Sequence, residues 1–281
     1  MRTPGATSAT SVTNATSFTN ALSDGFVVAK RNLIKIKRVP DLLVFTTLQP
    51  IMFVLLFAYV FGGAIDVKGS NYKEFLIAGI FAQTVVFGAT ITGAGLAEDI
   101  QKGIIDRFRS LPMSPSAVLF GRTLSDVVNN VIVVVVMSLT GLVVGWRIRT
   151  SVLEALGGFL ILLVFAYAFS WVMAMVGLLA PSPEVVNNAS FVVIFPLTFV
   201  ANTFVPINTL VGPLRAFAEW NPVSAVTEAA RRLFGNIAPG TPTPDSWALQ
   251  HPATYTLLWA LAILVVFVPL TTWQFRRSVS R

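Results

Sequence analysis

The sequence predicts an all-α integral membrane protein with six transmembrane helices, and three observations lead to that fold class. Hydrophobic residues make up 54% of the chain and charged residues only 12%, whereas a soluble domain carries about 25% charged residues. Six stretches without a charged side chain each reach the roughly 20 residues that cross a hydrocarbon core. Strands of a membrane barrel would instead be about 10 residues long, with alternating apolar and polar positions.

The distribution of basic residues predicts how these spans are oriented. The spans are expected at about 42–64, 74–97, 117–146, 153–180, 185–206 and 252–274, within one membrane domain of residues 41–275. Thirteen of the 20 Lys and Arg residues lie before the first span, between the second and third or at the start of the third, or after the last. Because cytoplasmic loops are enriched in Lys and Arg, both termini are predicted to be cytoplasmic.

The two ends of the chain differ in character. Residues 1–20 are rich in Ser and Thr and almost free of large apolar residues, so a disordered cytoplasmic tail is expected. Residues 21–40 carry apolar side chains at steps of three and four among five basic residues, which predicts an amphipathic helix in the inner interface. A plain positive flank of the first span is the alternative. Residues 276–281 form a short cytoplasmic tail.

A charged stretch at 98–111 separates the second span from the third. Ile100, Ile104, Phe108 and Leu111 form one apolar stripe of a helix, and acidic and basic residues stand three or four positions apart beside it. Pro112 ends the pattern. The stretch is therefore predicted to be a short amphipathic helix in the cytoplasm. It could join two spans as an interfacial helix, or it could dock a soluble partner.

Two other connections are expected outside the spans. The turn at 181–184 lies on the cytoplasmic side, where Glu184 either contacts a partner or belongs to a plain turn. Residues 207–251 form an extracellular segment with two short helices on either side of Asn221 and Pro222. These pieces are too short and too charged to span, so they are expected to be re-entrant helices at the outer interface.

The composition excludes several kinds of chemistry. The chain has no cysteine, a single histidine, His251, and no GxxxxGK[ST] motif that would bind a nucleotide. The spans hold amides and hydroxyls but no acid or base near their centres, which argues against proton coupling. Five polar residues are candidates for lining a pathway, with helix–helix hydrogen bonding as the alternative for each. They are Gln49, Gln83, Thr84, Asn187 and Asn202.

Three blocks of sequence resemble the daunorubicin/doxorubicin-resistance type of permease within the ABC type-2 transporter family. They are GIIDRFRSLPMS followed by AVLFGR, then PSPEVVNNASFVVIFPLTFVANTFVPINTL, then GPLRAFAEWNPVSAVTEAARRLFG. The likeness runs from about Lys30 to the C-terminus, with the blocks in the family's order. One departure is Ser182, where the family pattern leads us to expect a more polar or basic residue.

The resemblance implies a permease subunit, which is not itself an enzyme, in the bacterial plasma membrane. Its partners would be a cytoplasmic ABC ATPase that binds ATP and Mg²⁺, a second identical or related permease, and membrane lipid, with no nucleic acid. Its substrate would be a hydrophobic drug, antibiotic or lipid moved outward. Residues 98–111 would be the coupling helix and 21–40 the connecting helix. The implied ATPase-coupling residues are Glu98, Asp99, Lys102, Gly103, Ile104, Asp106, Arg107, Phe108, Arg109 and Glu184. A secondary transporter, or a membrane scaffold without catalytic activity, is the alternative.

Overall fold

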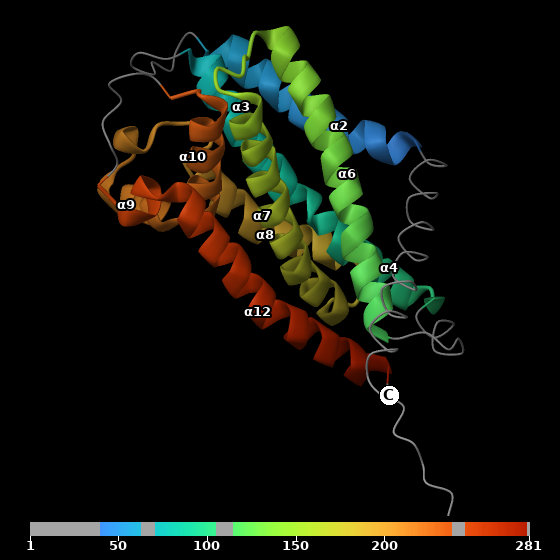
Figure 1. The fold of residues 1–281 in the computed structure, drawn as a ribbon. Coiled ribbons are helices and arrows are strands. Elements are labelled where there is room, and N and C mark those ends of the chain that lie inside the picture. The colour runs from blue at the N-terminus through green and yellow to red at the C-terminus, as the bar shows by residue number, and fades with distance from the viewer. Residues whose placement is uncertain (1–39, 63–70, 105–114, 238–244, 280–281) are drawn as a thin grey trace, which may run out of the picture.

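The computed structural model describes residues 40–62, 71–104, 115–237 and 245–279. Every long regular element in these residues is a helix, and none of them forms a strand, as the sequence predicts (Figure 1). The predicted tail at 1–20 and nearly all of the predicted connecting helix at 21–40 lie outside the described residues.

Four helical stretches among the described residues are long and apolar enough to cross a membrane. They are Tyr72–Gln101, Leu119–Val144, Val152–Leu179 and Pro252–Arg277. They correspond to the second, third, fourth and sixth predicted spans. Shorter helices occupy the places of the first and fifth: α2 (Pro40–Leu55), which continues into the π-helical turn η1 (Leu56–Phe61), and α8 (Pro183–Phe199). The count of six spans therefore stays a prediction.

Local capping residues explain where several of these helices begin. The second span consists of α3 (Tyr72–Gly88) and α4 (Thr90–Gln101), and the Asn71 side chain caps α3 by accepting a hydrogen bond from the Lys73 amide. Ser151 and Glu154 form a capping box at the start of α7 (Val152–Leu179). These polar caps sit where a helix leaves the apolar region, so the backbone donors of the first turn are not left unpaired.

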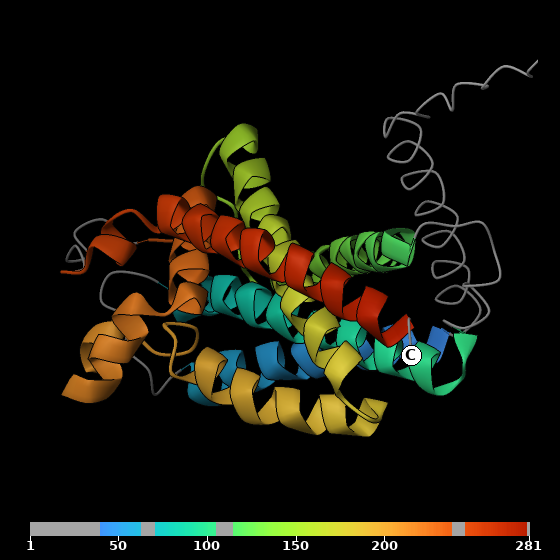
Figure 2. The ribbon, with the colours of Figure 1, turned by 90° about the horizontal axis from the view of Figure 1, so that it is seen from below.

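Helix α7 lies at the centre of the bundle. It packs against α3, α4, α10 (Pro222–Phe234), α6 (Pro115–Val144) and α12 (Pro252–Val279). Helix α12 runs along the outside, and many of its apolar side chains, such as Leu261 and Val265, are exposed (Figures 1 and 2). A large exposed apolar face is costly in water and favourable against lipid hydrocarbon, so this surface fits a membrane environment.

Short helices gather at one end of the bundle, which we call the α10 end. They are η2 (Ile207–Thr209), α9 (Gly212–Trp220), α10 (Pro222–Phe234) and α11 (Trp247–Gln250) (Figure 1). Trp146, which follows α6, is fully buried here against Phe81 and Phe234, and its indole N–H donates to Asn236 Oδ1 at 2.7 Å. Helix α10 is thereby joined to the long helices rather than loosely attached.

The opposite end, the α4 end, is where α4, α7 and α12 finish and where α6 and α8 begin (Figures 1 and 2). A single helix was predicted over 98–111, and the structure differs. Residues 98–101 are the last turn of α4, and the helix ends at Lys102. Gly103 follows with φ of 64°, a left-handed conformation that glycine adopts without strain and that commonly ends helices. Residues 105–111 lie outside the described residues.

Candidate functional site

The described part of the predicted docking segment is residues 98–104, which hold Glu98 and Asp99 on the last turn of α4 and Lys102 just after it. The Lys102 ammonium donates to the Glu98 carboxylate four residues earlier, and Lys102 is exposed. Ile104 is half-buried directly after the left-handed Gly103. A solvent-exposed pair of this kind adds little to helix stability, so its charges remain available to a partner.

Asp99 points into the bundle instead of toward a partner. Its residue is 7% exposed, and its carboxylate lies 3.7 Å from the Arg122 guanidinium on α6. Asp99 is one of the residues for which the family resemblance implies a coupling role, and its buried side chain contacts α6. The ion pair of Asp99 with Arg122 ties α4 to α6.

Arg122 belongs to a buried polar cluster between α4 and α6, which we call the inner charge cluster: Thr92, Asp99, Arg122 and Asp126. Arg122 Nη2 donates to the Ile91 carbonyl at 3.0 Å, and the Thr92 hydroxyl donates to the Asp126 carboxylate. The sequence did not predict this cluster. The available signal was the four-residue spacing of Arg122 and Asp126, which puts both on one helix face.

Glycine at position 95 makes room for this cluster. A Cβ added there would stand 1.5 Å from Arg122 Nη2, so Gly95→Ala would force the guanidinium away from the Ile91 carbonyl and Asp99. Leaving buried carboxylates without their counter-charge is strongly destabilising. We expect Gly95→Ala to lower the free energy of unfolding by about 2–4 kcal/mol. Thermal denaturation of the purified chain in lipid nanodiscs measures the change.

Gly157 on α7 provides the matched control for that prediction. The nearest atom to a Cβ built there is 3.8 Å away, so Gly157→Ala meets no clash. Alanine is favoured over glycine in a helix by about 1 kcal/mol, and this variant should be at least as stable as the wild type. Equal stability of the two variants would contradict the assigned role of Gly95.

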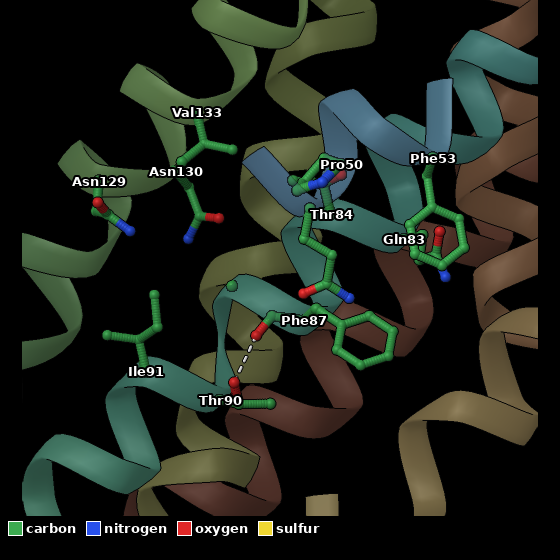
Figure 3. Close-up of a pocket in the computed structure, with 12 residues that line it drawn as sticks. Pro50, Phe53, Gln83, Thr84, Phe87, Thr90, Ile91, Asn129, Asn130 and Val133 are labelled. Carbon is green, nitrogen blue, oxygen red and sulfur yellow. Dashed lines mark hydrogen bonds between the residues drawn. The ribbon is translucent and has the colours of Figure 1, made fainter. Parts of the chain in front are cut away.

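A cavity of about 150 Å³ lies between α2, α3, α4 and α6. Figure 3 shows Asn129, Asn130 and Val133 of α6 on one side and Pro50, Thr84 and Phe87 opposite them. The remaining residues that line it are Gln49, Phe53, Gln83, Gly88, Thr90 and Ile91. None of these twelve residues is charged. Three of the five predicted pathway residues, Gln49, Gln83 and Thr84, are thus brought together around one cavity.

The polar side chains of this cavity differ in how their hydrogen bonds are used. Asn130 Nδ2 donates to the Asp126 carbonyl at 3.0 Å, and the Thr90 hydroxyl donates to the Phe87 carbonyl at 2.7 Å (Figure 3). Gln83, Thr84 and Asn129 are buried, yet their side chains form no hydrogen bond with any other described residue. Their polar atoms are not among those fully shielded from solvent, so these three side chains offer donors and acceptors to something inside the cavity.

At the α10 end, Arg231 is the centre of a second polar network. Its residue is 1% exposed, and its guanidinium donates to the Phe75 carbonyl at 2.9 Å, to Asn202 O at 2.6 Å and Thr203 O at 3.2 Å, and to Asn202 Oδ1. It also stacks on the Phe75 ring, 3.4 Å from the ring centroid. Burial lowers the pKa of Arg231 to about 9, with the charge of Glu228 opposing the shift, so the guanidinium is still charged at neutral pH.

The remaining predicted site residues lie apart from the cavity. Asn202 is buried in the Arg231 network, where its side-chain Nδ2 donates a hydrogen bond to Glu228 Oε2 at 3.2 Å. Asn187 is exposed on α8 and does not line the cavity. Glu184 is exposed in the first turn of α8, at the α4 end with Glu98 and Lys102 (Figure 1). Asp106, Arg107, Phe108 and Arg109 lie outside the described residues.

The described residues form an all-helical bundle with apolar spans, a charge-free cavity among them and a charged segment at one end. These features are typical of an integral membrane protein of the transporter kind. Comparison with known proteins agrees with that class. The sequence model of the family described as ABC-2 type transporter matches residues 24–234. This match covers most of the chain, and the chain belongs to the ABC-2 type transporter family.

Individual relatives are permeases of the same family. The chain is 34% identical over 248 residues to the daunorubicin resistance ABC transporter permease protein DrrB1 of Streptomyces coeruleorubidus, covering 88% of this chain and 84% of that protein. It is 27% identical over 217 residues to the putative transport permease ycf38 of Cyanophora paradoxa, covering 75% and 74%. The probable doxorubicin resistance permease DrrC of Mycobacterium tuberculosis is 25% identical over 231 residues, covering 82% and 80%.

Proposed function

We propose that this chain is the membrane-spanning permease subunit of an ATP-driven exporter that moves a hydrophobic drug, antibiotic or lipid out of the cell. Membership of the ABC-2 type transporter family carries the proposal. The chain has no GxxxxGK[ST] motif, so a separate ATPase subunit that binds ATP and Mg²⁺ would supply the energy. The chain would contribute the route through the membrane and a contact for that subunit.

The α4 end of the bundle is the proposed contact for the ATPase. Lys102 is exposed there beside the half-buried Glu98, and Glu184 stands at the start of the neighbouring span. Asp106, Arg107, Phe108 and Arg109 would extend the contact along the docking segment. Mixed charges set the register and specificity of such a contact, and apolar residues at its centre give most of the affinity.

The proposed transport route passes the cavity lined by Gln49, Gln83 and Thr84. Six membrane spans with both termini in the cytoplasm of a bacterial cell, surrounded by lipid, fit the division of charges in the sequence. A second permease, identical or related, would complete the transporter. Asn187 is exposed on α8 and does not line the cavity, so it would serve the route only from a surface shared with that second subunit.

Co-purification tests the proposal. The tagged chain is isolated from its native membrane in mild detergent, and bound proteins are identified by mass spectrometry. A soluble protein with a GxxxxGK[ST] motif in near-equal amount to the chain is the expected result. Recovery of the chain without any ATPase, under conditions that keep the spans folded, would contradict an ATP-driven exporter.

An ion-coupled secondary transporter is the second candidate, because one observation favours it. Asp126 is a buried carboxylate in α6, and intramembrane acids often carry protons or ions in such transporters. No such group was predicted from the sequence near the centre of a span. However, Thr92 donates to Asp126, and Arg122 lies one turn away as a counter-charge. A carboxylate held this way is better suited to joining two helices than to exchanging ions with solvent.

A further inference from the structure

We propose that the cavity between α2, α3, α4 and α6 binds one uncharged six-membered ring that carries hydroxyl or carbonyl groups, as part of a larger substrate. The inference deepens the proposed function and rests on it, because it treats the cavity as part of the transport route. Its three supports are the unused hydrogen-bonding groups, the absence of charge in the lining, and the size of the cavity.

Two carboxamide side chains supply the unused hydrogen-bonding groups. Gln83 and Asn129 are each only 6% exposed, yet their carboxamides have no partner among the described residues. Each carboxamide offers two N–H donors and one carbonyl acceptor, so together they match groups that both give and accept hydrogen bonds. Hydroxyl groups do both, and a carbonyl group accepts. The Thr84 hydroxyl, which can both donate and accept a hydrogen bond, belongs to the same lining.

The absence of charge in the lining also determines that the cavity favours an uncharged ligand. None of the twelve lining residues is ionisable, and the charged residues nearest in sequence, Arg122 and Asp126 on α6, are held by Ile91, Asp99 and Thr92. A cation or anion entering the cavity would lose its hydration without gaining a partner of opposite charge, which is very costly in an apolar region. An uncharged ligand avoids that cost.

The cavity is large enough for one ring. Its volume of about 150 Å³ equals that of an engineered cavity that takes up benzene. Phe53, Phe87 and Val133 supply apolar surface for the ring faces, while the carboxamides meet substituents on its edge. The remainder of a drug-sized substrate would extend beyond the described lining.

Three ring compounds of nearly equal shape test this selectivity: resorcinol, m-xylene and 1,3-dimethylpyridinium. Resorcinol carries two hydroxyl groups, m-xylene carries two methyl groups, and 1,3-dimethylpyridinium carries two methyl groups and a positive charge. Binding to the full-length chain in lipid nanodiscs is measured by saturation-transfer NMR as a function of probe concentration. We expect saturable binding of resorcinol and none of 1,3-dimethylpyridinium over the same concentration range.

Two single variants, Gln83→Met and Asn129→Leu, separate ligand recognition from a structural role. Each removes a carboxamide without a partner in the described structure, so each should melt at the same or a higher temperature than the wild type. Each should nevertheless bind resorcinol about tenfold more weakly while m-xylene binding is kept. Asn187→Leu, which removes an exposed carboxamide away from the cavity, should change neither.

Three results would overturn the inference: binding of 1,3-dimethylpyridinium as tight as that of resorcinol, unchanged resorcinol affinity in both cavity variants, or no saturable resorcinol binding by the wild type. The measurement uses no ATPase. Selective resorcinol binding by a chain that recruits no ATPase would therefore contradict the exporter and leave the selectivity of the cavity in place. A chain that binds an ATPase but lacks that selectivity would contradict the inference about the cavity and leave the exporter in place.

Discussion

Replacing Arg231 by methionine is expected to lower the free energy of unfolding by about 3–5 kcal/mol, the range for breaking a buried charge network. Methionine fills similar space but has no donors. It would leave the carbonyls of Phe75, Asn202 and Thr203 without the bonds that Arg231 now supplies, and it would remove the cation stacked on Phe75. These contacts connect α10 to α3 and to the segment after α8, so their loss should loosen the whole α10 end.

Arg232 is the matched control, since it is the next residue on the same helix. Its guanidinium donates to the carbonyls of Leu249 and Gln250, but its side chain is 36% exposed. Water can replace those bonds in part, so Arg232→Met should cost about 1 kcal/mol or less. Thermal denaturation of both variants in nanodiscs gives the comparison. A similar melting temperature for the two would show that burial of Arg231 contributes little.

The double substitution of Ile104 and Phe108 by alanine is expected to abolish ATP-driven transport while the spans remain folded. Both residues belong to the apolar stripe predicted for the docking segment, and central apolar anchors carry most of the affinity of an interface. Losing two such anchors costs roughly 2–4 kcal/mol of binding, which is a reduction in ATPase affinity of about 30-fold or more.

The readouts for the double variant are the amount of ATPase recovered with the tagged chain and the melting temperature of the chain itself. Leu153→Ala is the control, because Leu153 is an apolar residue that is 80% exposed at the start of α7, away from the α4 end. Full recovery of the ATPase with the Ile104→Ala, Phe108→Ala variant would remove the docking segment from the proposed contact.

The sequence predicted the class of fold well because that class depends on local composition. A charge-free stretch of about 20 residues specifies a membrane helix by its own transfer free energy, and the sites of α3, α6, α7 and α12 were evident without knowledge of their neighbours. The capping pattern of Asn221 and Pro222 similarly identified the start of α10, because an N-cap is a local feature.

Tertiary features escaped prediction for the corresponding reason. Asp99 has the sequence surroundings of an exposed coupling residue, and only the approach of α6 places Arg122 beside it. Asn202 has the surroundings of a pathway residue, and only the packing of α10 turns it toward Arg231. The break at Gly103 was also missed, because a glycine within a helical pattern is often tolerated without ending the helix. Pairings between distant helices are not encoded in spacing along one of them.

Measuring which energy source drives transport tests the proposal of an ATP-driven exporter most directly. The chain and its co-purified ATPase are reconstituted into proteoliposomes, and the movement of a panel of neutral apolar drugs and lipids is followed with ATP, with a non-hydrolysable ATP analogue, or with an imposed proton gradient. The account predicts movement with ATP alone, away from the side that carries the ATPase. Movement driven by the proton gradient without ATP hydrolysis would contradict it and would assign Asp126 to ion coupling.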